Sequence, residues 1–403
     1  MDAEEARTIG ARLRQIRRAR RKSLRVVAGL ADISTTNLHR IETGQRALDS
    51  LAEIVALADA LQIAPSELMR LPVPAPANGH TDSTVQAVDL ALTAVIHDVP
   101  EGHVLPAQAL RARVTATLDA LCRCDREQEV GDTLPGLIQD LHASIAAGRH
   151  VAELLGLSAL LHTQITVPWL SLSGASPDLR AQAVMLARHA AQERDTAASM
   201  GLVAAAGARV ALAKGAFDIA QAVLDAVTVP TDTPQAMQLA GFLALRRSVV
   251  AAADRRISDV GAPLDHAGEL AQRTGEGNAY GLGFGPINVD LYRISGLLEV
   301  GDHEEVVRIA EGMNPQRHAN RSRQVAYWAD YGQALARLRG RHEDAVWALR
   351  RAELISPHRI QRNPIVREVL GELLTRTRRD SPAGVELRRM AYRAGLPGIA
   401  QPG

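Results

Sequence analysis

Apolar residues recur every three or four positions along almost the whole chain, which is the spacing of one face of an α-helix. In the first 70 residues this pattern predicts five short helices: over residues 6–20, from residue 23, over 35–42, over 50–61 and from residue 65. From residue 84 onward the spacing is again helical, interrupted by glycine and proline, and no stretch alternates apolar and polar residues as a strand would. The chain is therefore predicted to be all-α.

A stretch rich in proline, alanine and polar residues, "PVPAPANGHTDS" at 72–83, separates two helical regions. Such a composition is typical of a linker. With 403 residues, the chain is long enough to form more than one core. We expect a small domain over 1–71, a linker over 72–83 and a larger helical domain over 84–403.

Three segments of the larger region share a pattern that begins with a glycine, at Gly215, Gly301 and Gly340. Five residues after the glycine comes a small or branched apolar residue, and a second apolar residue follows one helical turn later (Ala220 and Leu224, Val306 and Ala310, Ala345 and Leu349). This pattern resembles the second half of a tetratricopeptide repeat, in which a small residue lets paired helices pack closely. The resemblance implies degenerate helix pairs stacked into a right-handed superhelix.

Charge is distributed unevenly between the two regions. The whole chain has a formal net charge of +1, but residues 7–46 contain eleven basic residues against two acidic ones, a net charge of +9. Apolar residues interleave with this basic block at helical spacing, which favours a folded domain with a basic face over a solvated arm. A basic face of this kind is typical of proteins that bind nucleic acid.

Residues 23–46 resemble the helix-turn-helix of phage-repressor-type regulators, the XRE family. The matching positions are Val27, Ala28, Ile33, Ser34, Leu38, Ile41, Glu42, Gly44 and Arg46. The resemblance extends over residues 7–70 and departs from the family at Leu24 and Arg25, where the family often begins the helix with a glutamine. It implies that the helix over 35–42 enters the major groove of double-stranded DNA.

Geometry and the resemblance together assign roles to individual residues. We expect base contacts from Thr35, Thr36, Asn37 and Arg40, while His39 is either a base contact or a solvated neighbour. Phosphate contacts are expected from Ser23, Arg25, Ser34 and Arg46, with help from Arg18, Arg21 and Lys22. The resemblance implies that Arg17 pairs with Glu42 and so locks the first helix to the third, although a DNA contact by Arg17 is the alternative.

The combination of an XRE helix-turn-helix with tetratricopeptide-like repeats is similar to the peptide-sensing regulators of bacterial quorum systems. That resemblance implies a homodimer on a two-fold symmetric operator, with a peptide or small-molecule effector on the concave face of the repeats. Two alternatives stay open. The protein could be an antitoxin or scaffold whose repeats bind a partner protein, or the five helices could be an interaction module that has lost DNA binding.

The glycine-rich segment "RTGEGNAYGLGFGPINVDLYR" at 273–293 is a second candidate site. Gly281, Gly283, Gly285 and Asn288 could line a loop that presents backbone N–H groups to an anionic ligand at a helix start, or the segment could be a tight turn between repeats. The nearby aromatic residues Tyr327, Trp328 and Tyr331 could line a pocket or pack in the core.

No motif in the sequence predicts catalysis, a metal site or a cofactor. The segment "HEEVV" at 303–307 lacks the second histidine of a metalloprotease motif, and no phosphate-binding loop is present. Cys122 and Cys124 are expected to be free thiols, since one intervening residue makes a mutual disulfide awkward. The N-terminus lacks the apolar segment of a signal peptide, and no apolar run is long enough to span a membrane, so a cytoplasmic protein is expected.

Overall fold

The computed structural model describes residues 8–69, 79–124, 126–318 and 320–396. Within these ranges the chain forms α-helices and short helical turns, with one isolated β-bridge between Gly277 and Phe284 and no strand. The predicted all-α fold is confirmed: an N-terminal helix-turn-helix domain is followed by a larger helical region.

Five helices form the N-terminal domain: α1 (Ile9–Ala19), α2 (Leu24–Leu30), α3 (Thr35–Glu42), α4 (Leu51–Leu61) and α5 (Pro65–Met69). Serine side chains begin three of these helices, because Ser23, Ser34 and Ser50 each accept a hydrogen bond from a backbone N–H in the first turn. The inward faces enclose a core of their own, which includes Leu13, Val27, Leu38, Ile41, Ile54 and Leu57.

The larger region begins with α6 (Gly79–Ile96), α7 (Ala107–Arg123), α8 (Glu127–Ala146), α9 (Val151–Leu160), the π-helix η2 (Leu161–Thr166), α10 (Val167–Leu172) and α11 (Pro177–Arg194). It continues through α12 (Ala197–Ala213), α13 (Phe217–Asp225), α14 (Pro234–Ala253), η3 (Ile257–Asp259), α15 (Gly261–Thr274), η4 (Ala279–Gly281) and α16 (Pro286–Val300). Its last helices are α17 (His303–Glu311), η5 (Pro315–Arg317), α18 (Arg321–Arg337), α19 (His342–Ile355), α20 (Pro357–Gln361), α21 (Pro364–Arg376) and α22 (Pro382–Arg393).

Helix α6 begins at Gly79, inside the segment predicted to be a linker. The first residues of this helix are weak helix formers, so intrinsic helix propensity did not predict a helix there. Thr81 and Thr84 are buried and α6 packs along α8, so tertiary packing stabilises the start of the helix.

The three aligned glycines occupy equivalent places in the fold. Gly215, Gly301 and Gly340 have φ values of 72°, 83° and 81°, in the left-handed region that glycine adopts at low cost. Each ends or follows one helix and leads into the next, and these consecutive helices pack on each other: α12 on α13, α16 on α17 and α18 on α19. The apolar residues that follow the glycines are fully buried between the paired helices.

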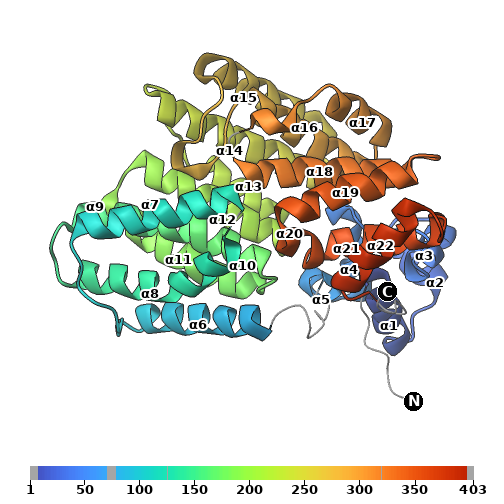
Figure 1. The fold of residues 1–403 in the computed structure, drawn as a ribbon, viewed down its shortest axis with the longest axis horizontal. Helices are drawn as coiled ribbons and strands as arrows, with labels where there is room; N and C mark the ends of the chain where they lie inside the picture. The colour runs from blue at the N-terminus through green and yellow to red at the C-terminus, as the bar shows by residue number, and fades with distance from the viewer. Residues whose placement is uncertain (1–7, 70–78, 125, 319, 397–403) are drawn as a thin grey trace.

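The helix pairs form a large curved body in which α14 is a central core helix (Figure 1). Among the described residues, α14 is the one helix long and apolar enough to span a membrane by length and composition, and 67% of its apolar window is buried inside the protein. That burial against α12, α15 and α16 accounts for its composition.

The N-terminal domain lies against the C-terminal helices, with α1 beside α21 (Figure 1). Two helices far apart in the sequence, α1 and α21, therefore lie side by side, and α2 and α3 lie at the outer edge of the molecule.

Candidate nucleic-acid interface

Helices α2 and α3 are joined by a tight turn. Asp32 has a φ of 55°, and the N–H of Ile33 donates to the carbonyl of Ala28 at 3.0 Å. Ser34 then begins α3, since its Oγ accepts from the N–H of Asn37 at 3.1 Å. Leu38, on the inward face of α3, is fully buried, so the angle between the two helices is fixed by the core.

The opposite face of α3 is open to solvent. Of the five predicted base-contacting residues, Asn37 is half-buried. The other four are exposed: Thr35, Thr36, His39 and Arg40. The Arg40 side chain has no hydrogen bond or ion pair with the part of the chain that the structure describes. These side chains lie along one turn and a half of helix, so they present one continuous polar face.

The predicted phosphate contacts fall into two groups. Ser23, Ser34, Arg18, Arg21 and Arg25 are exposed around α2 and α3. Lys22 and Arg46 are instead engaged within the domain: Lys22 Nζ donates to the carbonyl of Ala60 at 2.6 Å, and Arg46 Nη2 lies 2.8 Å from a Glu53 oxygen. Lys22 and Arg46 would reach a phosphate only by giving up these contacts.

Arg17 joins α1 to α3 through Glu42. Its Nε lies 2.5 Å from Oε1 and its Nη2 lies 2.7 Å from Oε2, a two-pronged pair, while Nη1 donates to the carbonyl of Lys22 at 2.9 Å. The hydrogen bond to Glu42 raises the pKa of Arg17 above its ordinary value. Each nitrogen of the Arg17 guanidinium thus donates a hydrogen bond inside the domain, and the pair with Glu42 holds α3 against α1.

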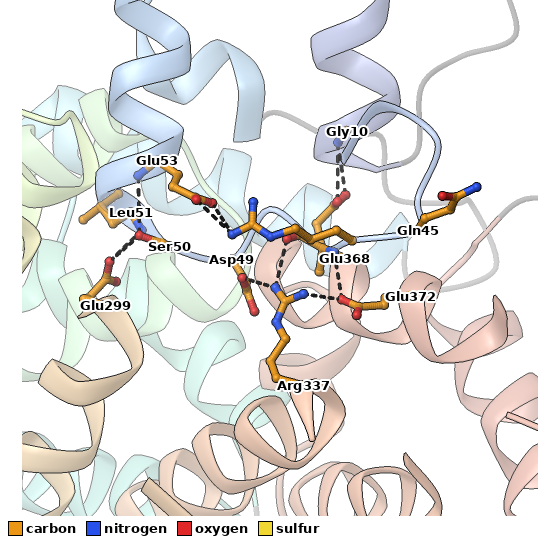
Figure 2. Close-up of polar contacts among 12 residues, drawn as sticks. Gly10, Gln45, Asp49, Ser50, Leu51, Glu53, Glu299, Arg337, Glu368 and Glu372 are labelled. Atoms are coloured by element: carbon orange, nitrogen blue, oxygen red, sulfur yellow. Dashed lines mark hydrogen bonds and ion pairs between the residues drawn. The ribbon is translucent and has the colours of Figure 1, made fainter. Parts of the chain in front are cut away.

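Three carboxylates from the larger region contact the N-terminal domain: Glu368 and Glu372 are buried, and Glu299 is half-buried (Figure 2). Glu368 accepts from the N–H groups of Ile9 and Gly10 at the start of α1. Glu299 accepts from Ser50 Oγ at 3.0 Å and from the N–H of Leu51 at 2.9 Å at the start of α4. Carboxylates at these places satisfy free N–H groups and complement the positive ends of the helix dipoles.

The third carboxylate, Glu372, acts together with Arg337. Glu372 accepts from the N–H of Ala47 at 2.8 Å and lies 2.6 Å from Arg337 Nη1. Arg337 Nη2 also pairs with Asp49 and donates to the carbonyl of Ala47 at 2.9 Å. The loop between α3 and α4 is therefore held by a largely buried set of ion pairs that Arg337 makes with Asp49 and Glu372 (Figure 2).

Sequence reasoning did not identify these anchoring residues. One signal was present: Glu368 and Glu372 are one helical turn apart on α21, among the buried residues Val369 and Leu373. Acidic residues on an otherwise apolar face have to find buried donors, although the sequence does not say where the donors are.

The glycine-rich segment makes hydrogen bonds both within itself and with neighbouring segments, since the N–H of Ala279 donates to Gln238 Oε1 at 2.9 Å and Asn320 Nδ2 donates to the carbonyl of Gly281 at 3.1 Å. The N–H of Gly283 donates to Asn278 Oδ1 at 2.9 Å. At the start of α16, which follows Gly285, Glu276 accepts from the N–H of Ile287 at 2.8 Å. A carboxylate of the chain itself therefore already lies where an anionic ligand was predicted to bind. Asn288 is fully buried, and its side-chain polar atoms have no hydrogen-bond partner. Of this set, Gly281 borders a cavity in the larger region.

The other candidates are placed as follows. Tyr327 is buried and donates to the carbonyl of Ala310 at 2.8 Å, with the Trp328 and Tyr331 rings packed against it at the edge of a core. Cys122 and Cys124 are free and buried. In the described ranges no group of three or more histidine, cysteine, aspartate or glutamate residues has the arrangement of a metal site.

Comparison with known protein families agrees with this geometry. Residues 8–71 match the model of a helix-turn-helix domain. No curated protein and no solved structure shows a significant match to the chain. The N-terminal domain is thus a helix-turn-helix domain, and it supports a role in DNA binding and transcriptional regulation.

Proposed function

We propose that the protein is a cytoplasmic transcriptional regulator of the XRE type, without catalytic activity, that binds a two-fold symmetric operator as a homodimer. In this proposal the larger region is an array of tetratricopeptide-like repeats that dimerises and senses a peptide or small molecule. The observation that carries the proposal is the recognition helix: α3 presents an exposed polar face with Arg40 while carboxylates of the larger region hold the domain from behind.

The proposed roles of individual residues follow from their exposure. Thr35, Thr36, Asn37 and Arg40 would reach base edges, and Arg18, Arg21 and Arg25 would contact phosphates. Arginine binds the acceptors of guanine with two hydrogen bonds, and such a contact contributes about 1–3 kcal/mol of discrimination. Phosphate contacts supply affinity that falls steeply with salt concentration.

The test is selection of bound sequences from a random duplex library with the full-length protein. A two-fold symmetric motif bound with a Kd of about 10⁻⁸ M or tighter supports the proposal. Arg40→Ala should bind DNA without the preference at one position of each half-site, whereas Arg14→Ala, an exposed arginine on α1, should keep the motif. Light scattering of the complex measures its stoichiometry.

Two results would contradict the proposal. One is the absence of any enriched motif together with a stable complex with another protein on native purification, which would favour the antitoxin or scaffold alternative. The other is an enriched motif that Arg40→Ala leaves unchanged, which would remove α3 from the interface.

A further inference from the structure

Four arginines converge on a cavity of about 290 Å³ inside the larger region. They come from four different helices: Arg209 from α12, Arg246 from α14, Arg323 from α18 and Arg359 from α20. These helices meet near the middle of the molecule (Figure 1). The end of α7 and the π-helix η2 complete the wall of the cavity. The cavity lies away from the helix-turn-helix.

The positive charge of this cavity is not balanced by the residues around it. None of the described residues that line it is acidic. Arg209 makes no hydrogen bond or ion pair with any residue that the structure describes, and Arg246 stacks on the Phe242 ring at 4.9 Å. Arg323 donates to the carbonyl of Leu282 at 3.3 Å, and Arg359 lies 3.8 Å from a Glu127 oxygen, too far for a strong pair.

Several donors in the cavity wall are also unused. The Nε atoms of Arg246, Arg323 and Arg359 are buried and have no hydrogen-bond partner among the described residues. Burial, together with the positive charges of Arg246, Arg180, Arg359 and Arg323, lowers the pKa of Arg209 to about 9. By contrast, the buried Arg337 is paired with Asp49 and Glu372. Unpaired guanidinium groups that repel one another are costly, and a bound anion would remove that cost.

We infer that this cavity is the binding site of a small organic polyanion, carrying at least two phosphate or carboxylate groups, and that this molecule is the effector of the regulator. The cavity volume equals the volume that about ten water molecules occupy in liquid water, which suits a metabolite-sized ligand. Phe242 supplies an apolar ring, and the side chains of Thr163, Gln164 and Ser322 supply neutral hydrogen-bonding groups. The effector role rests on the proposed function, whereas the binding site does not.

Helix α18 connects this cavity to the DNA-binding domain. Arg323, near the start of α18, lines the cavity, and Arg337, at its end, is the residue that pairs with Asp49 and Glu372 behind the helix-turn-helix. An anion that draws Arg323 toward Arg209 and Arg246 would shift the helix that anchors the domain.

The binding test uses titration calorimetry on the full-length protein with two probes, pyrophosphate and citrate, which distinguish a phosphate from a carboxylate ligand. We expect at least one probe to bind with a Kd below about 1 mM. Arg209→Gln and Arg246→Gln should each weaken it at least about tenfold, since each removes a charged hydrogen bond. Arg273→Gln, an exposed arginine on α15, is the control and should bind like the wild-type protein.

A folding control is built into the same variants. Because Arg209 and Arg246 repel each other, the ligand-free Arg209→Gln protein should have a Tm equal to or higher than that of the wild type. The proposal is overturned if neither probe binds, if binding is unchanged in both variants, or if both variants lower Tm, which would make the arginines structural.

The outcomes separate the binding site from the proposed function. Probe binding that depends on Arg209, without any enriched DNA motif, would support the anion site and reject the regulator. An enriched DNA motif without probe binding would support the regulator and reject the anion site. A probe that binds and changes operator affinity at least about threefold in wild type, and not in Arg209→Gln, supports both.

Discussion

Arg323 and Arg337 lie near the two ends of one helix, α18, about 21 Å apart at the rise of an α-helix. The first guanidinium borders the arginine-lined cavity, and the second holds the loop between α3 and α4. A helix of this length moves as a unit, so a displacement of α18 at the cavity also displaces Arg337 at the loop between α3 and α4.

Arg337→Gln tests this relationship. The variant should bind pyrophosphate or citrate like the wild type but lose the effect of the bound anion on operator affinity, because the link between α18 and the DNA-binding domain is broken. Operator Kd values with and without the probe measure this, and Arg339→Gln, an exposed neighbour, is the control. A full effect of the anion in Arg337→Gln would show that coupling does not pass through this contact.

Breaking the pair between Arg17 and Glu42 should destabilise the N-terminal domain. Both side chains are largely buried, with 11% and 3% of their surface exposed, so Arg17→Met or Glu42→Leu leaves an uncompensated charge and should cost about 3–5 kcal/mol. The double variant should lose less than the sum of the two, which urea unfolding measures. Strictly additive losses would mean that the pair contributes no coupling energy.

Gly10 and Gly29 offer a matched test of how closely α1 approaches α3. A Cβ on Gly10 would lie 2.2 Å from the backbone oxygen of Ile41, so Gly10→Ala has to push the two helices apart and should cost about 2 kcal/mol or more. A Cβ on Gly29, in α2, meets nothing within 4 Å. Gly29→Ala should therefore stabilise the domain by about 0.5–1 kcal/mol in the same unfolding experiment.

The anchoring carboxylates predict a dependence of stability on pH. Burial raises the pKa of Glu368 to about 7, while in the unfolded chain it is about 4.3. Between these values Glu368 holds a proton in the folded protein that it has released in the unfolded chain, so its contribution to the free energy of unfolding should fall as the pH rises from about 4.5 to 7.

Glu368→Gln should reduce the slope of Tm against pH over this window, because glutamine still accepts from Ile9 and Gly10 but does not ionise. Part of the slope should remain, since burial raises the pKa of Asp330 to about 7 as well and also raises the pKa of Glu299. An Asp330→Asn variant separates that contribution. An unchanged slope in Glu368→Gln would show that this carboxylate does not titrate in the window.

The sequence by itself determined the local structure of this protein. Ser23, Ser34 and Ser50 mark helix starts because a capping side chain acts on backbone groups two or three residues away. The apolar spacing around Leu38 defined the inward face of α3, and so also the exposed face that carries Arg40. These are interactions within one or two helical turns, and a linear pattern contains them in full.

Only the tertiary structure decided what happens between distant segments. Glu368 accepts from the N–H of Ile9, and Glu299 from the N–H of Leu51, contacts that join segments far apart in the sequence. The arginine cavity likewise needs α12, α14, α18 and α20 to meet at one point. The sequence does not show which partners these charged residues meet, because burial and pairing depend on the packing of whole helices rather than on local spacing.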